Sequence, residues 1–319
     1  MVGKLTKNWR ASCSLIAQIM ELSPWGTRVD ALHRCIQAKT GVLPDHEQNR
    51  FQRLGDVLEP VILAEAANLL GLIKWNFYID ESWNHKVLPL SGSADGIAYV
   101  GDEDIVLCTD PDKGIFTPND EYVYLRAGSA VVLEAKATSN FPDTELPAWR
   151  GAIQVQGLME CHNPPCSYGC VAVLYQSTDL RLFIFERDPK FLELITDIIP
   201  DFNRRVQEED YYAPFSSKDC NTIWSQALDE AVEVDGNAEQ AGRDILAAKQ
   251  KIKECKEIID SNETVIKSQM GSNQYGKVGN LIYTWKTRTY RKQPEKIIEA
   301  KPQRIIRQSN ITIKELKDD

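Results

Sequence analysis

The chain has 319 residues, of which 43% are hydrophobic and 26% are charged, so its composition is that of a globular protein and excludes a disordered chain. No apolar run approaches the roughly 18 residues that a membrane helix needs, and the first residues lack the apolar region of a signal peptide. We therefore expect a cytoplasmic protein with no membrane partner. In such a chain the eight cysteines are expected to be thiols and not a disulfide framework.

The charge is unevenly distributed. The net charge of −9 argues by itself against nucleic acid as a partner. Residues 271–319, however, contain 11 Lys and Arg against 5 Asp and Glu, so this tail carries about +6 and the rest about −15. A basic tail on an acidic body can still bind phosphate locally.

Apolar residues at helical spacing open the chain. They predict helices over 12–23, where Ser12 is a plausible N-cap, over 28–41 and over 49–72. Pro60 is expected to kink the third of these helices or to mark a first turn.

The pattern then changes to strands. Segments 75–82 and 85–100 are typical of strands with turns, and the polar segment 101–128 fits a hairpin insertion. The later elements, in chain order, are a strand over 129–138, a helix over 146–161, strands over 169–178 and 181–188, and a helix over 189–207. This order predicts a mixed α/β fold with a central mixed β-sheet flanked by helices.

A second region follows the core. We place the boundary so that residues 1–212 form the core domain and 213–319 a C-terminal extension. Residues 237–270 have the apolar spacing of an amphipathic or coiled-coil helix, and 280–293 alternate basic and aromatic residues as in a strand.

Two charged residues interrupt the most apolar strand, "VVLEAKATSN". Side chains alternate across a strand, so Glu134 and Lys136 share one face, while Val131, Leu133 and Ala135 share the apolar face. Such a pair is either a simple salt bridge or part of a polar site.

Asp95 lies at a glycine-flanked turn before an expected strand. If that strand pairs with the strand of Glu134, the two carboxylates approach each other, and ionisation of both is costly without a cation. Mg²⁺ prefers oxygen ligands, and the backbone carbonyl of Ala135 could supply another. Alternatively, Asp95 simply forms the turn.

Two further polar positions join this pattern. Glu59 lies largely in the apolar, core-facing stripe of the third helix, where a carboxylate is expensive to bury unless it is paired or binds metal. The alternative for Glu59 is a place on the helix surface, at the border of that stripe. Gln154 and Gln156 are about 200° apart on their helix, so only one can face the site.

The order of these motifs resembles the PD-(D/E)XK nuclease superfamily, and more narrowly the YqaJ-type viral recombinase family to which lambda exonuclease belongs. The similar segments, which span roughly residues 9–212, are "RLGDVLEP", "GSADGI", "VVLEAKAT" and "AIQVQGLM", with "RASCSLIAQIM" before them and "FIFERDPKFLELITDIIPDF" after them. Ala94 replaces the usual proline before the motif Asp, and the 38 residues between Asp95 and Glu134 are an elaboration.

The resemblance implies a PD-(D/E)XK nuclease core and hydrolysis of DNA with Mg²⁺ or Mn²⁺, two ions per site. Asp95, Glu134 and the carbonyl of Ala135 would bind metal, and Glu59 would complete a second or outer site. Lys136 would position or deprotonate the attacking water, and Gln154 would orient Lys136 or the water.

The resemblance also implies partners. Ser12, with Arg10 or Lys4, would bind the 5′-phosphate of a duplex end, although Ser12 can equally be a plain N-cap. Trp9, Trp25 and Arg53 are candidates for contact with DNA ends by location alone. The implied enzyme degrades linear duplex DNA 5′ to 3′ for phage-type recombination in a bacterial host cell, with a single-strand annealing protein as a possible partner and a ring, perhaps a trimer, as family precedent.

Three alternatives stay open at this stage. One is a structure-specific nuclease on the same fold. Another is an iron–sulfur nuclease, since Cys161, Cys166 and Cys170 are close in sequence and Cys13 or Cys35 could be a fourth ligand. The third is a non-catalytic DNA-binding or assembly protein.

Overall fold

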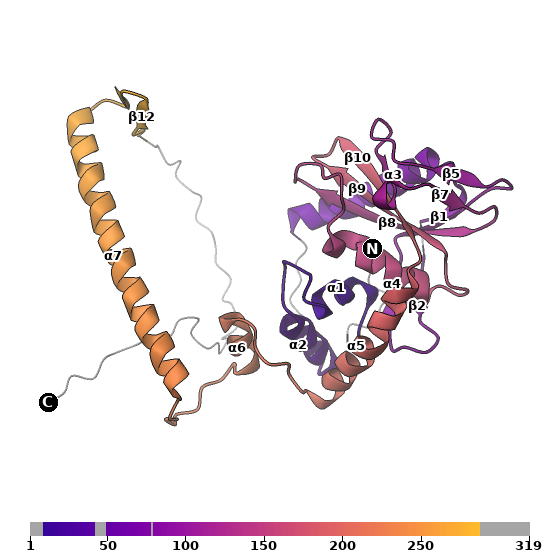
Figure 1. Cartoon of the computed structure of the whole chain (residues 1–319), viewed down its shortest axis with the longest axis horizontal. Helices are drawn as coiled ribbons and strands as arrows, with labels where there is room; N and C mark the ends of the chain where they lie inside the picture. Colours follow the sequence, from indigo (N-terminus) through magenta and orange to yellow (C-terminus); the bar gives the residue numbers. More distant parts are fainter. Residues whose placement is uncertain (1–8, 42–48, 78, 288–319) are drawn as a thin grey trace, which may run out of the picture. The chain divides into compact units, whose positions relative to one another are not determined.

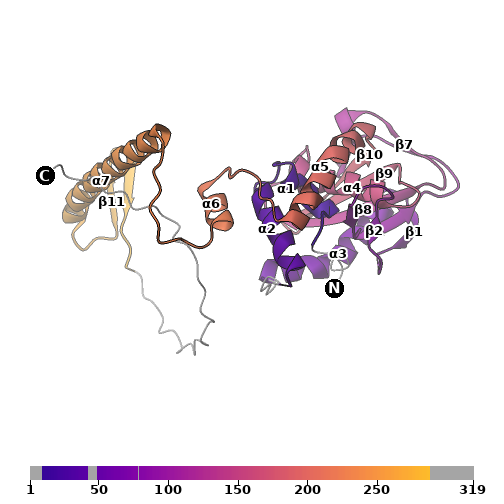
Figure 2. The ribbon, with the colours of Figure 1, turned by 90° about the horizontal axis from the view of Figure 1, so that it is seen from below.

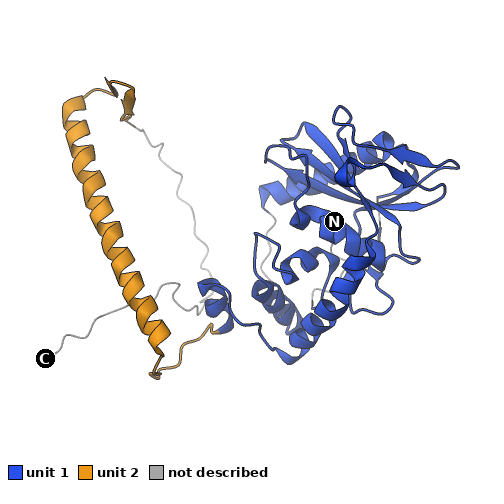
Figure 3. Cartoon of the chain, in the orientation of Figure 1, with its two compact units in different colours: residues 1–223 blue, residues 224–319 orange. Residues whose placement is uncertain are grey.

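The structure is a computed structural model that describes residues 9–41, 49–77 and 79–287. The chain divides into two compact units, residues 1–223 and 224–319 (Figure 3). The first unit extends past residue 212 because α6 (Ser217–Ile223) packs against α2 (Arg28–Lys39). Asp219 of α6 accepts a hydrogen bond of 2.6 Å from Thr27 Oγ1, the N-cap of α2.

A six-stranded mixed sheet is the centre of the first unit (Figure 1). Its order is β1-β4-β8-β9-β10-β6; β8 pairs parallel with β9, β10 pairs parallel with β6, and the other neighbours are antiparallel. The strands are β1 (Ile73–Asn76), β4 (Gly96–Tyr99), β6 (Ile115–Phe116), β8 (Ala130–Thr138), β9 (Tyr168–Tyr175) and β10 (Asp179–Glu186). The predicted mixed α/β class with a central mixed sheet is confirmed.

Helices cover both faces of this sheet (Figures 1 and 2). On one face α4 (Ile153–Cys161) packs on β8 and β9, followed by α1 (Ile16–Ile19), α2 and α5 (Pro189–Glu208). On the other face lies α3 (Arg50–Leu69), which buries Ile62, Leu63, Ala66 and Ala67. Pro60 lies inside α3, and a capping box from Asn49 begins this helix.

Strand alternation separates the two cores. Val131 and Leu133 pack in the α3-side core, whereas Val132 packs in the α4-side core. Glu134 and Lys136 have the same parity as Val132, so they share one face, as the sequence predicts, and that face is the α4 side.

The segment 101–128 forms more than a hairpin. Strands β5 (Ile105–Leu107) and β7 (Val123–Leu125) pair antiparallel outside the main sheet and bury Leu107 and Leu125 in the α3-side core. Between them, β6 joins the main sheet beside β10, which the sequence does not predict. The short pair β2 (Trp83–Asn84) and β3 (Ser91–Gly92) precedes Asp95.

The second unit contains a long helix and a hairpin. Helix α7 (Gly236–Met270) is capped by Asp235, whose carboxylate accepts from the backbone of Asn237 and Ala238. Strands β11 (Tyr275–Val278) and β12 (Leu281–Thr284) pair antiparallel. The rest of the expected basic strand, beyond residue 287, lies outside the described residues. None of the described helices combines the length and apolar composition of a membrane span.

Two glycines in the 101–128 segment give a matched test of how firmly it is attached. Both have positive φ, +69° at Gly114 and +72° at Gly128, but a Cβ at Gly114 would lie 2.3 Å from the carbonyl oxygen of Leu180, whereas one at Gly128 would meet nothing within 4 Å among the described residues. Gly128→Ala should cost about 1 kcal/mol of unfolding free energy, and Gly114→Ala roughly 3 kcal/mol or more. Denaturant unfolding measures the free energy of unfolding of both variants. Equal losses of stability would show that β6 is not packed closely against Leu180 of β10.

Candidate active site

The antiparallel pairing of β4 with β8 places Asp95 beside Glu134. Gly96 pairs with Leu133, so the preceding residue, Asp95, comes opposite Glu134. The carboxylate of Asp95 accepts a hydrogen bond of 2.9 Å from the backbone N–H of Ala135. This bond fixes the Asp95 side chain against β8, so the two acidic side chains of the sequence pattern do meet.

Glu134 is buried, with 1% of its surface exposed. Its Oε1 accepts hydrogen bonds from Lys136 Nζ and, at 2.6 Å, from Gln154 Nε2. Its Oε2 is buried without a hydrogen-bond partner among the described residues. An unsatisfied buried carboxylate oxygen is costly and is an acceptor available to a cation or a proton.

The two glutamines of α4 have separate tasks. Gln154 faces the site and holds Glu134. Gln156 points away, donates at 2.8 Å to the carbonyl of Glu186 and accepts at 3.1 Å from the backbone of Asp188. Gln156 therefore ties α4 to the connection between β10 and α5.

Electrostatics couple the three charged groups. Burial and the negative charge of Asp95 raise the pKa of Glu134 to about 8, although the ammonium of Lys136 opposes the shift. Burial works against the charged form of Lys136, but Glu134 and Asp95 outweigh it and raise the pKa of Lys136. Without a bound cation, Lys136 is thus held in its protonated form.

Glu59, on α3, interacts electrostatically with Asp95 and Lys136 of the same site. Partial burial, then the charges of Asp95 and Asp56, raise the pKa of Glu59 to about 7, and Lys136 acts in the opposite direction. Glu59 is half-buried at the border of the apolar stripe, which is the alternative that the sequence left open and not the core-facing position that the helical spacing favoured. Its place is at the periphery of the site.

The donor chemistry fits a hard divalent cation. Among the described residues, no three side chains of His, Cys, Asp or Glu are already gathered closely enough to hold a metal ion. Mg²⁺ is nevertheless often held by one or two carboxylates and completed by waters and substrate phosphate. Asp95 and the unsatisfied Oε2 of Glu134 supply such oxygens, and the Ala135 carbonyl would add a further one.

Arg10 and Ser12 meet the chain just before Asp95. Arg10 donates from Nε to Ser91 Oγ at 3.2 Å and from Nη2 to Asn84 Oδ1, and Ser12 forms an isolated bridge with Ser91. Ser12 Oγ lies 3.1 Å from Ser14 Oγ and makes no side-chain cap bond to the following 3₁₀ turn, η1 (Cys13–Leu15). Lys4 lies outside the described residues.

An irregular turn before α4, with non-helical backbone angles at Arg150 and Gly151, contains residues that the sequence patterns did not single out. Over η3 (Ala148–Ala152), Gly151 has a φ of 104°, and a Cβ there would lie 3.0 Å from Val171 Cγ1 and 3.7 Å from Lys136 Cε. Glycine thus permits the positive φ of this turn and its close approach to Val171, while the contact with Lys136 would be an ordinary one. Arg150 is buried beside it, and the dipeptide Arg-Gly just ahead of the Gln motif is the signal that could have indicated this.

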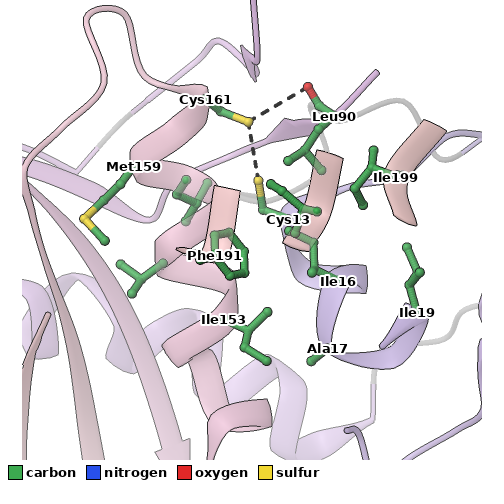
Figure 4. Packing of buried hydrophobic residues seen from close by; sticks show 14 of the residues in the cluster. Cys13, Ile16, Ala17, Ile19, Leu90, Ile153, Met159, Cys161, Phe191 and Ile199 are labelled. Carbon is green, nitrogen blue, oxygen red and sulfur yellow. Dashed lines mark hydrogen bonds between the residues drawn. The ribbon is translucent and has the colours of Figure 1, made fainter. Parts of the chain in front are cut away.

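The five cysteines considered as cluster ligands are buried and pack as small apolar residues. Cys13 and Cys161 lie in the α4-side core, with their Sγ atoms 3.6 Å apart and the Cys161 thiol facing the carbonyl of Leu90 (Figure 4). Cys166 lies in the same core, but Cys170 belongs to the core across the sheet. Burial raises the pKa of Cys166 and of Cys170 to about 12, which disfavours the thiolates that metals need. This geometry argues against an iron–sulfur cluster.

Comparisons with known proteins find similar structures. No protein-family model and no curated protein matches the sequence. An alkaline exonuclease from Laribacter hongkongensis, LHK-Exo, is 16% identical with a TM-score of 0.44, and its complex with dAMP is 15% identical with a TM-score of 0.45; both similarities cover 64% of this chain and 90% of that one. A phage-related exonuclease from Haemophilus somnus 129PT is 14% identical with a TM-score of 0.42, over 63% of this chain and 94% of that one. These neighbours are exonucleases, the class that the sequence resemblance predicts.

Two buried glutamates give a test of the electrostatics. Because the pKa of Glu134 in the folded state is raised above its ordinary value of 4.5, its contribution to stability is complete below pH 4.5 and is lost as pH rises toward 8. Glu134→Gln breaks the ion pair with Lys136 but also removes the buried charge, and burial and Asp95 outweigh Lys136 in their effect on that charge. In EDTA its unfolding temperature should therefore exceed that of the wild type by a few degrees at pH 8 and by much less at pH 4.5.

Glu160 is the matched control. Its side chain is also 1% exposed, but it accepts two hydrogen bonds from Arg187, at 2.6 and 2.8 Å. Glu160→Gln should lower the unfolding temperature at pH 8, because it breaks a buried ion pair. A Glu134→Gln variant that loses stability at pH 8 as Glu160→Gln does would contradict the unsatisfied state of Glu134.

Proposed function

We propose that this protein is a Mg²⁺- or Mn²⁺-dependent exonuclease that hydrolyses linear duplex DNA, 5′ to 3′, and leaves 3′ single strands for phage-type homologous recombination. The observation that carries the proposal is the junction of Asp95, Glu134 and Lys136 across β4 and β8, with one buried carboxylate oxygen unsatisfied. A simple salt bridge needs neither the second carboxylate nor the open oxygen. The exonuclease neighbours and the order of the sequence motifs agree with it.

The residues of the site have distinct parts in this reaction. Asp95, Glu134 and the carbonyl of Ala135, with Glu59 at an outer position, would hold the metal, which supplies positive charge against the phosphate and makes water more acidic. Lys136 Nζ positions the attacking water or takes its proton. Gln154 holds the Glu134 carboxylate in place through Oε1.

The end of the DNA strand would be recognised by Arg10 and Ser12. Both meet Ser91 at the start of β3, four residues before Asp95, so a phosphate bound there would lie close to the acidic pair along the chain. The guanidinium of Arg10 can donate two parallel hydrogen bonds to a phosphate. If Arg10 releases Asn84 Oδ1, its Nη2 can donate to a phosphate oxygen instead. A single-strand annealing protein and a ring assembly belong to the same proposal.

Digestion of end-labelled linear duplex with Mg²⁺ tests the function. We expect release of nucleotides from the 5′ end, a preference for 5′-phosphate over 5′-hydroxyl ends, and no hydrolysis in EDTA. Covalently closed circles of the same sequence serve as the control substrate. Their degradation would refute the exonuclease, and release only from 3′ ends would refute the direction.

Three alanine variants, at Lys136, Gln154 and Gln156, test the roles of these residues. Lys136→Ala should lower kcat about 10²- to 10⁴-fold, and Gln154→Ala should lower it because Glu134 loses a hydrogen bond. Gln156→Ala, two residues along the same helix but directed at the backbone of Glu186, should keep its activity. Steady-state hydrolysis of linear duplex measures all three; full activity of Lys136→Ala would contradict the mechanism.

A further inference from the structure

Helix α7 of the second unit exposes a line of isoleucines along its length. Of its 35 residues, Met270 is the one that is buried among the described residues. An isoleucine recurs at every seventh position of the helix, at Ile245, Ile252, Ile259 and Ile266. The first three are 40%, 54% and 57% exposed, and the fourth is half-buried. Because most helical stability in proteins comes from packing of an apolar face, this stripe indicates a missing partner.

The spacing of the stripe indicates what kind of partner fits. A strict repeat of seven residues keeps an apolar line in contact with a second helix when the two wind around each other at 3.5 residues per turn. In the heptad notation abcdefg the isoleucines occupy position a in four successive heptads. Such a pattern, sustained over three to four heptads with charges beside it, is typical of a coiled coil.

The second core position of the heptad has a different composition. Position d holds only small or polar residues, namely Ala241, Ala248, Cys255, Asn262 and Gln269. β-branched residues at a and not at d are the arrangement of parallel two-stranded coiled coils, whereas isoleucine at d favours more strands. The composition therefore favours one partner helix.

The opposite face of α7 has the character of a surface in water. Two ion pairs between positions b and f lie there, Glu239 with Arg243 and Lys253 with Glu257. Pairs four residues apart on a helix stabilise an exposed face. The isoleucine stripe and these ion pairs thus give α7 one face for a partner and one for solvent.

A second copy of the same helix complements the stripe. In a parallel pair in register, each isoleucine meets the same isoleucine, and Asn262 meets the same asparagine of the second copy. In an antiparallel pair position a faces position d, so isoleucines would face the amides of Asn262 and Gln269. Burying an amide against an apolar side chain costs free energy. The separation of apolar and polar layers therefore favours the parallel pair.

The charges beside the stripe do not oppose this arrangement. In the parallel pair Asp244, at position g, faces Lys249, at position e of the other copy, and opposite charges at these positions are favourable. Lys251 and Lys256 face each other in the same way and repel. The attractive and repulsive contacts are equal in number, and exposed pairs are weak. The isoleucine layers therefore decide the association.

We propose that α7 pairs in parallel with α7 of a second copy of this chain, through the stripe of Ile245, Ile252, Ile259 and Ile266. The pair is symmetric, so each dimer carries two copies of the first unit. All the residues that carry this inference belong to the second unit. It therefore goes beyond the proposed function and does not depend on it.

Oxidative cross-linking of the full chain tests the pairing. Cys255 is exposed at position d, so in the parallel pair its thiol faces the same thiol, within the roughly 7 Å between Cα atoms that a disulfide can bridge. Added diamide takes up the two electrons and two protons that the thiols release. A non-reducing gel should then show a product of twice the chain mass, and Cys255→Ser should abolish it.

Cys108→Ser is the matched control. Cys108 is the other cysteine that is exposed in the structure, and it belongs to the first unit. This variant should form the cross-linked dimer as the wild type does. A wild type that forms no cross-link, or one that needs Cys108 and not Cys255, would overturn the parallel pair.

Two adjacent isoleucines test the stripe itself. Ile259 lies in the stripe, whereas Ile258 is 61% exposed, almost as Ile259 is, but occupies position g. In reducing buffer, Ile259→Ala should weaken the dimer about 10-fold or more, because each dimer loses two core isoleucines. Ile258→Ala should weaken it about 5-fold or less. Sedimentation velocity over a range of chain concentrations measures the dissociation constants.

Circular dichroism of the Ile259→Ala and Ile258→Ala variants confirms that α7 remains helical. Equal dissociation constants for the two variants would overturn the role of the stripe. A wild type that stays monomeric at the highest concentration would overturn the pairing, because the stripe would then be covered within one chain.

Discussion

A carboxylate buried on the central strand is the constraint around which this fold is arranged. Glu134 is 1% exposed, and Asp95 faces it from the neighbouring strand. Burial and repulsion by Asp95 both oppose the negative charge of Glu134. Lys136 and Gln154 donate hydrogen bonds to Oε1, but Oε2 has no hydrogen-bond partner among the described residues. The arrangement makes sense where a positive ion or a proton is to be taken up.

Three elements must agree to build this site. The register of β4 on β8 sets Asp95 opposite Glu134, and the parallel β9 places the apolar Val171 beside Glu134 on its other side. The irregular turn η3 leads into α4, on which Gln154 faces β8 and Gln156 faces the end of β10. The polar site therefore depends on apolar packing on both faces of the sheet.

Sequence reasoning predicted those parts that follow from periodicity. Alternation along 131–138 placed Glu134 and Lys136 on one face, and the spacing of 49–72 predicted the helix of Glu59. Helical spacing alone could not choose between Gln154 and Gln156, because non-helical angles at Arg150 and Gly151 precede α4; only the family resemblance named Gln154. Adjacency in sequence likewise grouped Cys166 with Cys170, which the sheet separates onto opposite faces.

The alternation along β8 also bears on how accurately the sheet assembles. A slip of one residue would turn Glu134 and Lys136 into the core beneath α3 and bring Leu133 and Ala135 to the polar side. Two charges in that apolar core would find neither Gln154 nor Asp95, so the mispaired chain would be heavily penalised. The residues proposed for chemistry thus also favour the correct register of the strand that carries them.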